Sequence, residues 1–416
     1  MQSSAVRIRS DALSRITGVS LLLGLAFATS VLGMLLIRGN SPISPIWFTS
    51  GILLGILLRS PTWRWPELLG AGLFGMVLAG FATGQSVFNG ILFASCSALE
   101  VVVVAAPIRR RAGADMDPER LLKFARYGVM GAAFAPALSG LLVALVLQTA
   151  KSVPFWQTFV VWYPAGALGI VIMTPLVLVA QRRVFARMVS RGQRWTTFCA
   201  FGLLATTSGA VFSQEVTPLL SAILPPLLYV AFKRGFAGAS IGVALVMCIG
   251  LAGTVLGHGP LALMRGASLS DKILALQFFM IAASLMVFPA TIVLSERRTL
   301  RRTLMDSERR YRTLADYSSD IIVRSSLDGT RLYVSPAAEE VLGWTVVELL
   351  GAARIDLVHP DDRHLFEEEL AELSRGLATS TIVYRCRHKR GHYIWVESAA
   401  RRVSDAGPGQ AGEIIR

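Results

Sequence analysis

The sequence predicts a polytopic all-α membrane bundle of about ten spans, followed by a small C-terminal α+β domain. Three observations carry this prediction. Between residues 15 and 294, apolar runs of about 17–25 residues follow one another, which is the length needed to cross a hydrocarbon core. After residue 294 no such run recurs, and charged residues become dense. The remaining residues alternate short strand and helix patterns, which is typical of a soluble α+β domain.

The apolar runs define the expected spans. The second and the eighth are short, so we expect them to be tilted or partly re-entrant. The first run is long, lacks a small-residue cleavage site and is followed by further spans, which excludes a cleaved signal peptide. The expected spans lie near residues 16–37, 43–58, 66–83, 87–107, 122–147, 159–180, 195–213, 218–232, 236–256 and 273–294.

The net charge of +14 belongs wholly to the apolar half. Residues 1–295 contain 22 Lys and Arg against 8 Asp and Glu, whereas residues 296–416 contain 19 of each. A nucleic-acid-binding protein would carry its basic residues on a soluble surface, so no nucleic-acid partner is expected. If the N-terminus lies inside, 18 basic residues fall on cytoplasmic segments and four on outer loops. This positive-inside bias predicts that both termini are cytoplasmic. The four outer basic residues are Arg38, Lys151, Arg265 and Lys272.

Glu100 is the only carboxylate well inside an apolar run. An ionisable side chain at that depth is costly unless it is paired or used. Glu100 and Asn89 are therefore a candidate intramembrane polar site, for which two interpretations are open. In the first, Glu100 faces the bundle and accepts a hydrogen bond from a nearby serine or from Asn89. In the second, Glu100 is a ligand or proton site.

Tryptophans at the ends of runs are expected to anchor the protein at the membrane interface. Glycine-rich stretches beginning at Gly70 and Gly235 are expected to be close-packing helix faces. The cysteines are far apart and show no metal-ligand spacing, so we expect small core residues rather than a metal site or a disulfide framework. The residues concerned are Trp47, Trp63, Trp65, Trp156, Trp162 and Trp195, and Cys96, Cys199, Cys248 and Cys386.

Short motifs follow one another through the apolar half. Their positions are Trp47, Gly51, Pro66, Gly70, Gly169, Pro175, Gly235, His258, Gly259 and Pro260. In order and spacing, over residues 15–297, these motifs resemble the membrane-associated sensor (MASE) domain of the first type. The family often has Trp-Pro-Pro-Ala-Gly where this chain has Trp47-Phe-Thr-Ser-Gly51, and often Arg where Lys233 stands. The resemblance implies a sensor domain of the bacterial inner membrane, and it implies architecture rather than a particular ligand.

A helical linker follows the last span. Apolar and polar residues recur there with a 4-3-4-3 spacing, which predicts a short coiled-coil seam in a homodimer. Polar residues within the seam make the coiled coil weak. A weak seam suits a switch, because a strongly specified seam would not change register. The alternative is a lone amphipathic helix that caps the next domain. The seam residues are Val293, Arg297, Leu300, Leu304, Ser307, Tyr311 and Leu314.

The soluble region has the pattern of a small α+β fold. Strands are expected on both sides of Leu327-Asp-Gly-Thr330, followed by two short helices that end at Gly343 and Gly351. A longer helix then runs to Leu373, two strands lie within 380–402, and a last strand begins at residue 412. These elements, with the motif residues His359, Pro360, Asp361, Asp362, Arg363, Gly391 and Trp395, resemble a PAS domain.

The PAS resemblance raises the question of a cofactor. Histidine and aspartate at 359 and 361 are interpreted as helix caps rather than as catalytic groups. PAS domains that bind flavin covalently have an Asn-Cys-Arg motif, which is absent here, because Cys386 lies on a late strand. Haem would need an axial histidine in the pocket, and His364 is expected to face solvent. No cofactor is evident, and a small PAS ligand stays open.

The predicted domain order is a cytoplasmic N-terminus (1–15), a MASE-type domain (16–294), a signalling linker (295–314) and a PAS domain (315–416) whose last strand is truncated. No Gly-rich phosphate loop or acidic metal pair stands in a suitable context, so no catalytic domain and no metal site are expected within the chain. The resemblance implies the input region of a GGDEF diguanylate cyclase. A sensor histidine kinase is the alternative, and a transporter or membrane scaffold is a third interpretation. The expected partners are the bilayer, a second copy and a C-terminal output domain.

Overall fold

The computed structural model describes residues 2–36, 44, 46–112, 125–181, 186, 188, 190, 192–351, 355–403 and 412–416. Within these ranges, the side chains of residues 2–14, 112, 125–130, 311, 312, 314 and 316 lie outside the description. The chain forms two compact units, a membrane unit (Met1–Arg297) and a soluble unit (Arg298–Arg416).

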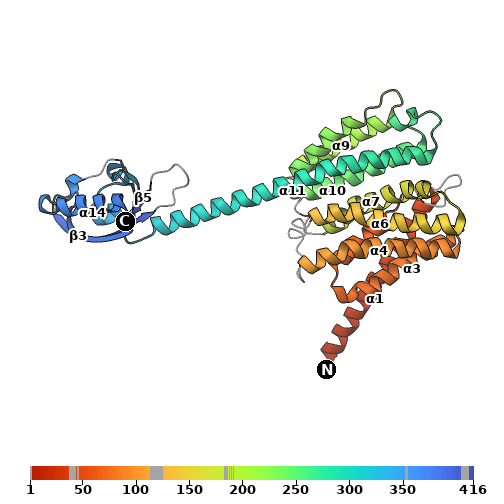
Figure 1. Cartoon of the computed structure of the whole chain (residues 1–416), viewed down its shortest axis with the longest axis horizontal. Coiled ribbons are helices and arrows are strands. Elements are labelled where there is room, and N and C mark those ends of the chain that lie inside the picture. The colour runs from red at the N-terminus through yellow and green to blue at the C-terminus, as the bar shows by residue number, and fades with distance from the viewer. Residues whose placement is uncertain are drawn as a thin grey trace. The chain divides into compact units, whose positions relative to one another are not determined.

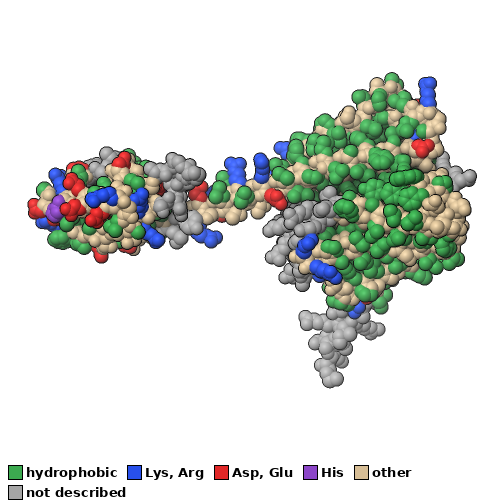
Figure 2. Space-filling view, viewed as in Figure 1, with side chains coloured by type: hydrophobic (Ala, Val, Ile, Leu, Met, Phe, Trp, Pro, Cys, Tyr) green, Lys and Arg blue, Asp and Glu red, His purple; other side chains and the backbone are tan. Residues whose placement is uncertain are grey.

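The membrane unit is all-helical (Figure 1). Its helices are α1 (Gln2–Leu35), α2 (Thr49–Arg59), α3 (Trp65–Ala82), α4 (Val87–Ala112), α6 (Ala125–Lys151), α7 (Phe155–Val179), α9 (Arg194–Ser213), α10 (Leu224–Leu256) and α11 (Leu269–Asp316), with the short helices η1 (Thr62–Arg64), η2 (Leu220–Ile223) and η3 (Pro260–Leu263). Hydrophobic side chains cover most of the visible face of this unit, as a lipid-facing surface requires (Figure 2).

Eight stretches of the described residues are long and apolar enough to cross a membrane, and α2 is a shorter apolar helix. One stretch, 220–263, has 44 residues, about twice the length that a bilayer needs. It folds back at Gly235, whose φ of 62° and ψ of −150° interrupt α10. A Cβ placed on Gly242 would lie 3.0 Å from Leu227 Cδ1, whereas a straight helix separates such residues by about 22 Å. The structure therefore contains the predicted eighth and ninth segments, and the all-α bundle of about ten segments is confirmed.

Helix α2 packs directly on α7 through two glycines. A Cβ on Gly51 would lie 1.9 Å from the carbonyl oxygen of Gly169, and a Cβ on Gly169 would lie 2.0 Å from that of Trp47. The Thr174 hydroxyl donates a 2.9 Å hydrogen bond to the Gly51 carbonyl. Only glycine allows the two backbones to approach this closely, which is the usual role of small residues between membrane helices.

Polar contacts sort the loops into two faces of the bundle. On one face, Arg15 and Arg64 bind Glu67, Arg59 binds the Val177 and Ala180 carbonyls, and Arg234 binds Gln193. On the other, Lys151 binds Ser86 and Asn89, and His258 binds Glu215. We call these the arginine face and the opposite face. The predicted positive-inside topology groups the same loops together.

The last helix of the bundle, α11, continues without interruption into the linker and ends at Asp316. Two predicted seam residues, Leu300 and Leu304, are 72% and 69% exposed in the single chain. The side chains of two further seam residues, Tyr311 and Leu314, lie outside the described residues. The described part of the seam thus exposes two leucines on a long helix, with the polar residues Arg297 and Ser307 between the apolar ones.

The soluble unit is a five-stranded antiparallel sheet in the order β2-β1-β5-β4-β3. The elements are β1 (Val323–Ser326), β2 (Arg331–Val334), β3 (Thr379–Arg387), β4 (Tyr393–Val403) and β5 (Glu413–Ile415), with α12 (Ala337–Leu342), α13 (Val346–Leu349), α14 (Arg363–Arg375), η4 (Ile355–Leu357) and η5 (Pro360–Asp362). The last strand lies between β1 and β4, so the segment from residue 412 joins the two parts of the sheet. Gly343 and Gly351 follow the two short helices with positive φ, as expected for glycine at those helix ends.

Candidate sensory sites in the bundle and the soluble domain

Glu100 is fully buried in the middle of α4 and is bound by two neighbouring helices. The Ser139 hydroxyl of α6 donates a hydrogen bond to its Oε1. Trp162 Nε1 of α7 donates to the same oxygen at 3.0 Å. The second carboxylate oxygen, Oε2, has no hydrogen-bond partner. The carboxylate is therefore satisfied on one side only.

A cavity of about 10 Å³ adjoins this carboxylate. That is room for one atom the size of a water oxygen. Three aromatic side chains form part of its wall, and the Phe93 and Trp162 rings lie 5.3 Å apart. The lining residues are Ser44, Trp47, Gln85, Phe93, Glu100, Trp162, Ala165 and Gly166.

The structure corrects two expectations about this region. Trp47 and Trp162 are 8% and 5% exposed, so they are not interface anchors. Their indole nitrogens bind Ser97 and Glu100 inside the bundle. Asn89 is not a partner of Glu100, because it lies three turns away on α4 and accepts a 2.8 Å hydrogen bond from Lys151 on the opposite face. Trp63, Trp156 and Trp195 are exposed, as interface anchors would be.

The remaining motif residues of the bundle lie away from Glu100. Pro66 is in the first turn of α3, Pro175 lies inside α7, and Gly235 forms the fold-back. Gly259 has a φ of 91°, and a Cβ there would meet Phe212, while Pro260 begins η3. His258 lies 2.7 Å from Glu215 on the opposite face. Nothing lies within 4 Å of a Cβ placed on Gly70 or Gly235, so the packing glycines are their neighbours Gly72, Gly75, Gly238 and Gly242.

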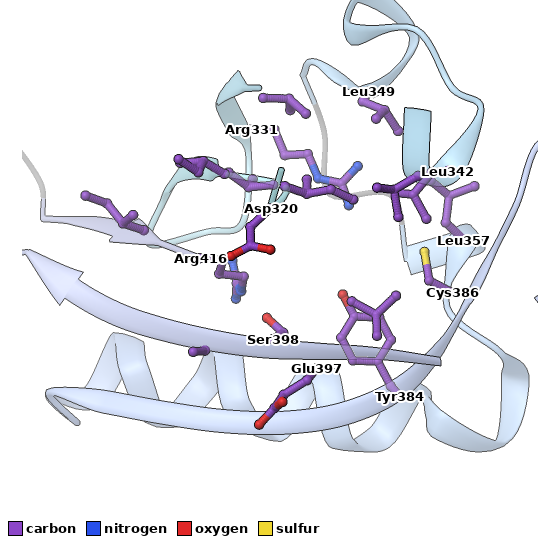
Figure 3. Close-up of a pocket in the computed structure, with 18 of the residues that line it drawn as sticks. Asp320, Arg331, Leu342, Leu349, Leu357, Tyr384, Cys386, Glu397, Ser398 and Arg416 are labelled. Atoms are coloured by element: carbon purple, nitrogen blue, oxygen red, sulfur yellow. The ribbon is translucent and has the colours of Figure 1, made fainter. Parts of the chain in front are cut away.

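The soluble domain contains a second, much larger cavity of about 600 Å³. That volume is typical of small-molecule pockets. Leu342, Leu349 and Leu357 give it an apolar wall, whereas Asp320, Arg331, Tyr384, Ser398 and Arg416 supply polar groups. Figure 3 shows the Tyr384 hydroxyl and the Asp320 carboxylate directed into the cavity, and the Glu397 side chain directed away from it.

Burial sets the charge of the groups in this pocket. It raises the pKa of Tyr384 to about 12, and it also raises the pKa of the Cys386 thiol. Both groups are therefore protonated at neutral pH, and Cys386 is a weak nucleophile. Arg416, which lines the pocket, binds the buried Glu369 at 3.4 Å and Ser325 at 3.2 Å. Burial raises the pKa of Glu369 even though Arg416 opposes it.

The motif that begins at His359 joins α14 to the sheet. His359 Nδ1 accepts a hydrogen bond from the Asp361 backbone at 3.3 Å, which caps η5. Asp362 immediately precedes α14, and its side chain makes no cap bond to that helix. Its carboxylate instead accepts bonds from the backbone and the guanidinium of Arg385 on β3, at 2.7–2.9 Å. Arg385 in turn lies over the Trp395 ring, 5.4 Å from its centroid.

The other PAS positions bear on cofactors. Arg363 begins α14, and Gly391 turns the chain between β3 and β4 with a φ of 96°. His364 is exposed, and no histidine is among the residues that line the pocket. Cys386 does line it (Figure 3), a placement that its position on a late strand did not reveal.

Comparison with known families assigns both units. The MASE1 family matches residues 17–298, and the PAS fold matches residues 331–412. The chain belongs to the MASE1 family. It is a multi-pass membrane protein in which a MASE1 domain is followed by a PAS domain, and this architecture is that of a membrane sensor.

Relatives match both units or the PAS unit alone. Over 381 residues the chain is 22% identical to a probable diguanylate cyclase, DgcE, of Escherichia coli K12, covering 91% of this chain and 34% of DgcE. The White collar 1 protein of Neurospora crassa is 32% identical over 97 residues, 23% of this chain and 8% of that protein. A solved PAS domain from Colwellia psychrerythraea shares 24% identity, covers 26% of this chain and 93% of its own, and has a TM-score of 0.24. The chain thus spans about a third of the length of DgcE.

Proposed function

We propose that this MASE1–PAS chain is the sensory input of a diguanylate cyclase in the bacterial inner membrane. The observation that carries the proposal is the similarity to DgcE, which extends over 91% of the chain and so includes both units rather than one shared module. In the proposed protein, a GGDEF domain that condenses two GTP into cyclic di-GMP follows the PAS domain. The bundle reads a signal at the membrane, and the PAS domain relays it.

The proposed relay is the helix α11. It belongs to the bundle at its start and reaches Asp316, seven residues before β1, so little chain lies between the end of this helix and the PAS sheet. Exposed Leu300 and Leu304 would form the seam with a second copy. Arg297 and Ser307 weaken that seam, so two pairings would differ little in free energy. A small change in the bundle would then be enough to shift the population.

The experiment is to express the full-length gene product and to measure cyclic di-GMP formation from GTP. Residues 1–416 alone are the matched control, and they should convert neither GTP nor ATP. GTP turnover by the full-length protein that is lost when its GGDEF loop is mutated supports the proposal. ATP-dependent autophosphorylation on histidine instead of GTP turnover would assign a histidine kinase and refute it.

The proposed orientation places the arginine face in the cytoplasm. The test is cysteine-accessibility labelling of intact cells, using a variant in which the native cysteines are replaced. A cysteine in the 258–271 loop should react with an impermeant reagent from outside. A cysteine in the 183–194 loop should react only after the cells are opened. The reverse result would overturn the orientation.

A further inference from the structure

Unpartnered polar atoms gather around Glu100. Among the described residues, eight buried side-chain oxygen or nitrogen atoms lack a hydrogen-bond partner. Three of them belong to Glu100, Gln85 and Ser50. Glu100 and Gln85 line the 10 Å³ cavity, and the Ser50 hydroxyl lies beside the carboxyl group without making a well-formed hydrogen bond to it. Such clustering marks a place where something is bound, because buried polar groups are normally satisfied.

The chemistry of these atoms defines what could be bound. Glu100 Oε2 and Gln85 Oε1 are both acceptors, whereas the indole N–H groups of Trp47 and Trp162 already donate to protein oxygens. A ligand must therefore donate hydrogen bonds, which excludes anions. Among the described residues, no Lys, Arg or His makes an ion pair with Glu100. A buried carboxylate without a cation is costly, so positive charge on the ligand is favoured.

The walls and the volume of the cavity further limit the class of ligand that could bind. Trp47, Phe93 and Trp162 present aromatic rings to the cavity, and aromatic faces attract cations. A divalent metal ion would need about six oxygen ligands, and no group of three or more His, Cys, Asp or Glu that could hold a metal lies among the described residues. The space admits one heavy atom.

We propose that the Glu100 cavity is a binding site for a small monovalent cation of the ammonium class, held by the Glu100 carboxylate between aromatic walls. Three helices build the site. Glu100 comes from α4, Ser139 from α6, and Trp162 from α7, and α7 also carries Gly169, which holds α2 in contact. Occupation of the site would therefore tie together helices from across the bundle. The idea that ammonium binding is the sensed signal rests on the proposed function. The prediction that ammonium binds at this site does not.

The test is a cation titration of the purified chain of residues 1–416 in lipid nanodiscs. The unfolding midpoint is followed by tryptophan fluorescence while ammonium chloride replaces choline chloride at fixed ionic strength and pH. Sodium, potassium and methylammonium chloride form parallel arms. The isosteric variant Glu100→Gln removes the charge. Glu215→Gln, which removes an exposed carboxylate of the opposite face, is the matched control.

Ammonium should raise the midpoint saturably in the parent and in Glu215→Gln. Glu100→Gln should lose at least about tenfold in apparent affinity, because a hydrogen bond to a charged group is lost. Methylammonium should bind more weakly, since the cavity lacks room for its methyl group. If Glu100→Gln does not fold, Gln85→Ala replaces it and should also weaken the ammonium effect.

Equal responses to all the salts, or an ammonium response that Glu100→Gln retains, would mean that the cavity holds a structural water only, and the proposal would be wrong. A stronger response to sodium or potassium than to ammonium would also overturn it. The titration needs no output domain. Its failure therefore leaves the proposed cyclase input standing, and a failure of the cyclic di-GMP assay leaves the cation site standing.

Discussion

The two cavities of this chain differ in size and in how their polar groups are held. The bundle cavity has a volume of about 10 Å³ and adjoins a carboxylate that three helices enclose. The PAS pocket has a volume of about 600 Å³ and mixes leucines with arginine, tyrosine and serine. The first can accept only an atom-sized ligand, whereas the second has room for a small organic molecule.

The difference follows from the environment of each unit. Lipid offers no hydrogen bonds, so a bundle tolerates polar groups only where neighbouring helices satisfy them almost completely. The PAS sheet faces water, and ion pairs such as Arg385 with the buried Asp362 hold its parts together around an open centre. The stability of the tightly packed bundle should therefore fall strongly when a side chain is enlarged. The stability of the PAS domain, which ion pairs hold together, should fall in acid.

The largest effect is expected at the contact between α2 and α7. Gly169→Val would drive its side chain into the Trp47 carbonyl, which a Cβ alone approaches to 2.0 Å. We expect a loss of more than about 4 kcal/mol, which is enough to prevent bundle assembly. The measurement is monodispersity and unfolding midpoint in detergent. Gly70→Val, at a glycine with open space around it, is the control and should assemble normally.

A smaller loss of stability is expected when a side chain is enlarged at the bundle cavity, and the same kind of change at the PAS pocket serves as the comparison. In Gly166→Ala the new methyl group would lie 3.0 Å from Glu100 Oε1 and 3.2 Å from Pro136 Cβ, so we expect a loss of about 1–3 kcal/mol. Ser398→Leu adds more atoms, but to the PAS pocket, where space is available, and it should cost less stability than Gly166→Ala. Local hydrogen exchange in each unit measures both. Equal losses would show that the PAS pocket is closed in solution.

The smallest expected effect is on acid stability. Lys389 and the cap at Thr345 lower the pKa of Glu348 to about 2, and Arg385 holds the pKa of Asp362 well below its usual range. A lowered folded-state pKa contributes stability above the unfolded value of about 4, which is lost as pH falls toward 2. The raised pKa of the buried Glu369 acts in the opposite direction.

Hydrogen exchange between pH 7 and 3 should therefore show that α13 and β3 open at a higher pH than the bundle helices. Glu348→Gln should reduce the pH dependence at α13, whereas the exposed control Glu340→Gln should not. If the bundle helices opened at a higher pH than α13 and β3, ion pairing would not explain the difference in acid stability between the two units.

Much of the architecture was readable from the sequence because it depends on local patterns. Apolar run lengths predicted the segments, and the glycines after the two short PAS helices marked their ends. The sequence even separated 218–232 from 236–256, although α10 joins them without a loop, because Lys233, Arg234 and Gly235 interrupt the apolar pattern.

The candidate sites were less predictable because they depend on contacts between distant segments. Glu100 was identified because it is a carboxylate in an apolar run, but its partners Ser139 and Trp162 lie 39 and 62 residues away. Asn89 is nearer to Glu100 in sequence, but the prediction that it binds Glu100 was wrong. Trp47 and Trp162 looked like interface anchors because position along a run does not reveal which face of a helix is buried. For Trp47, the motif that it shares with Gly51 was a signal of burial that sequence reasoning could have used.

We propose that the bundle controls the output through the helix α11, and a pair of insertions in the full-length protein tests this relay. Four residues inserted after Leu304 turn the downstream helix by about 40° and break the heptad phase, whereas seven residues preserve the phase. Cyclic di-GMP formation is measured in membranes that contain each variant. We expect the four-residue insertion to lock or abolish output and the seven-residue insertion to leave it regulated. If both variants behave like the parent, α11 is a passive tether and the account is contradicted.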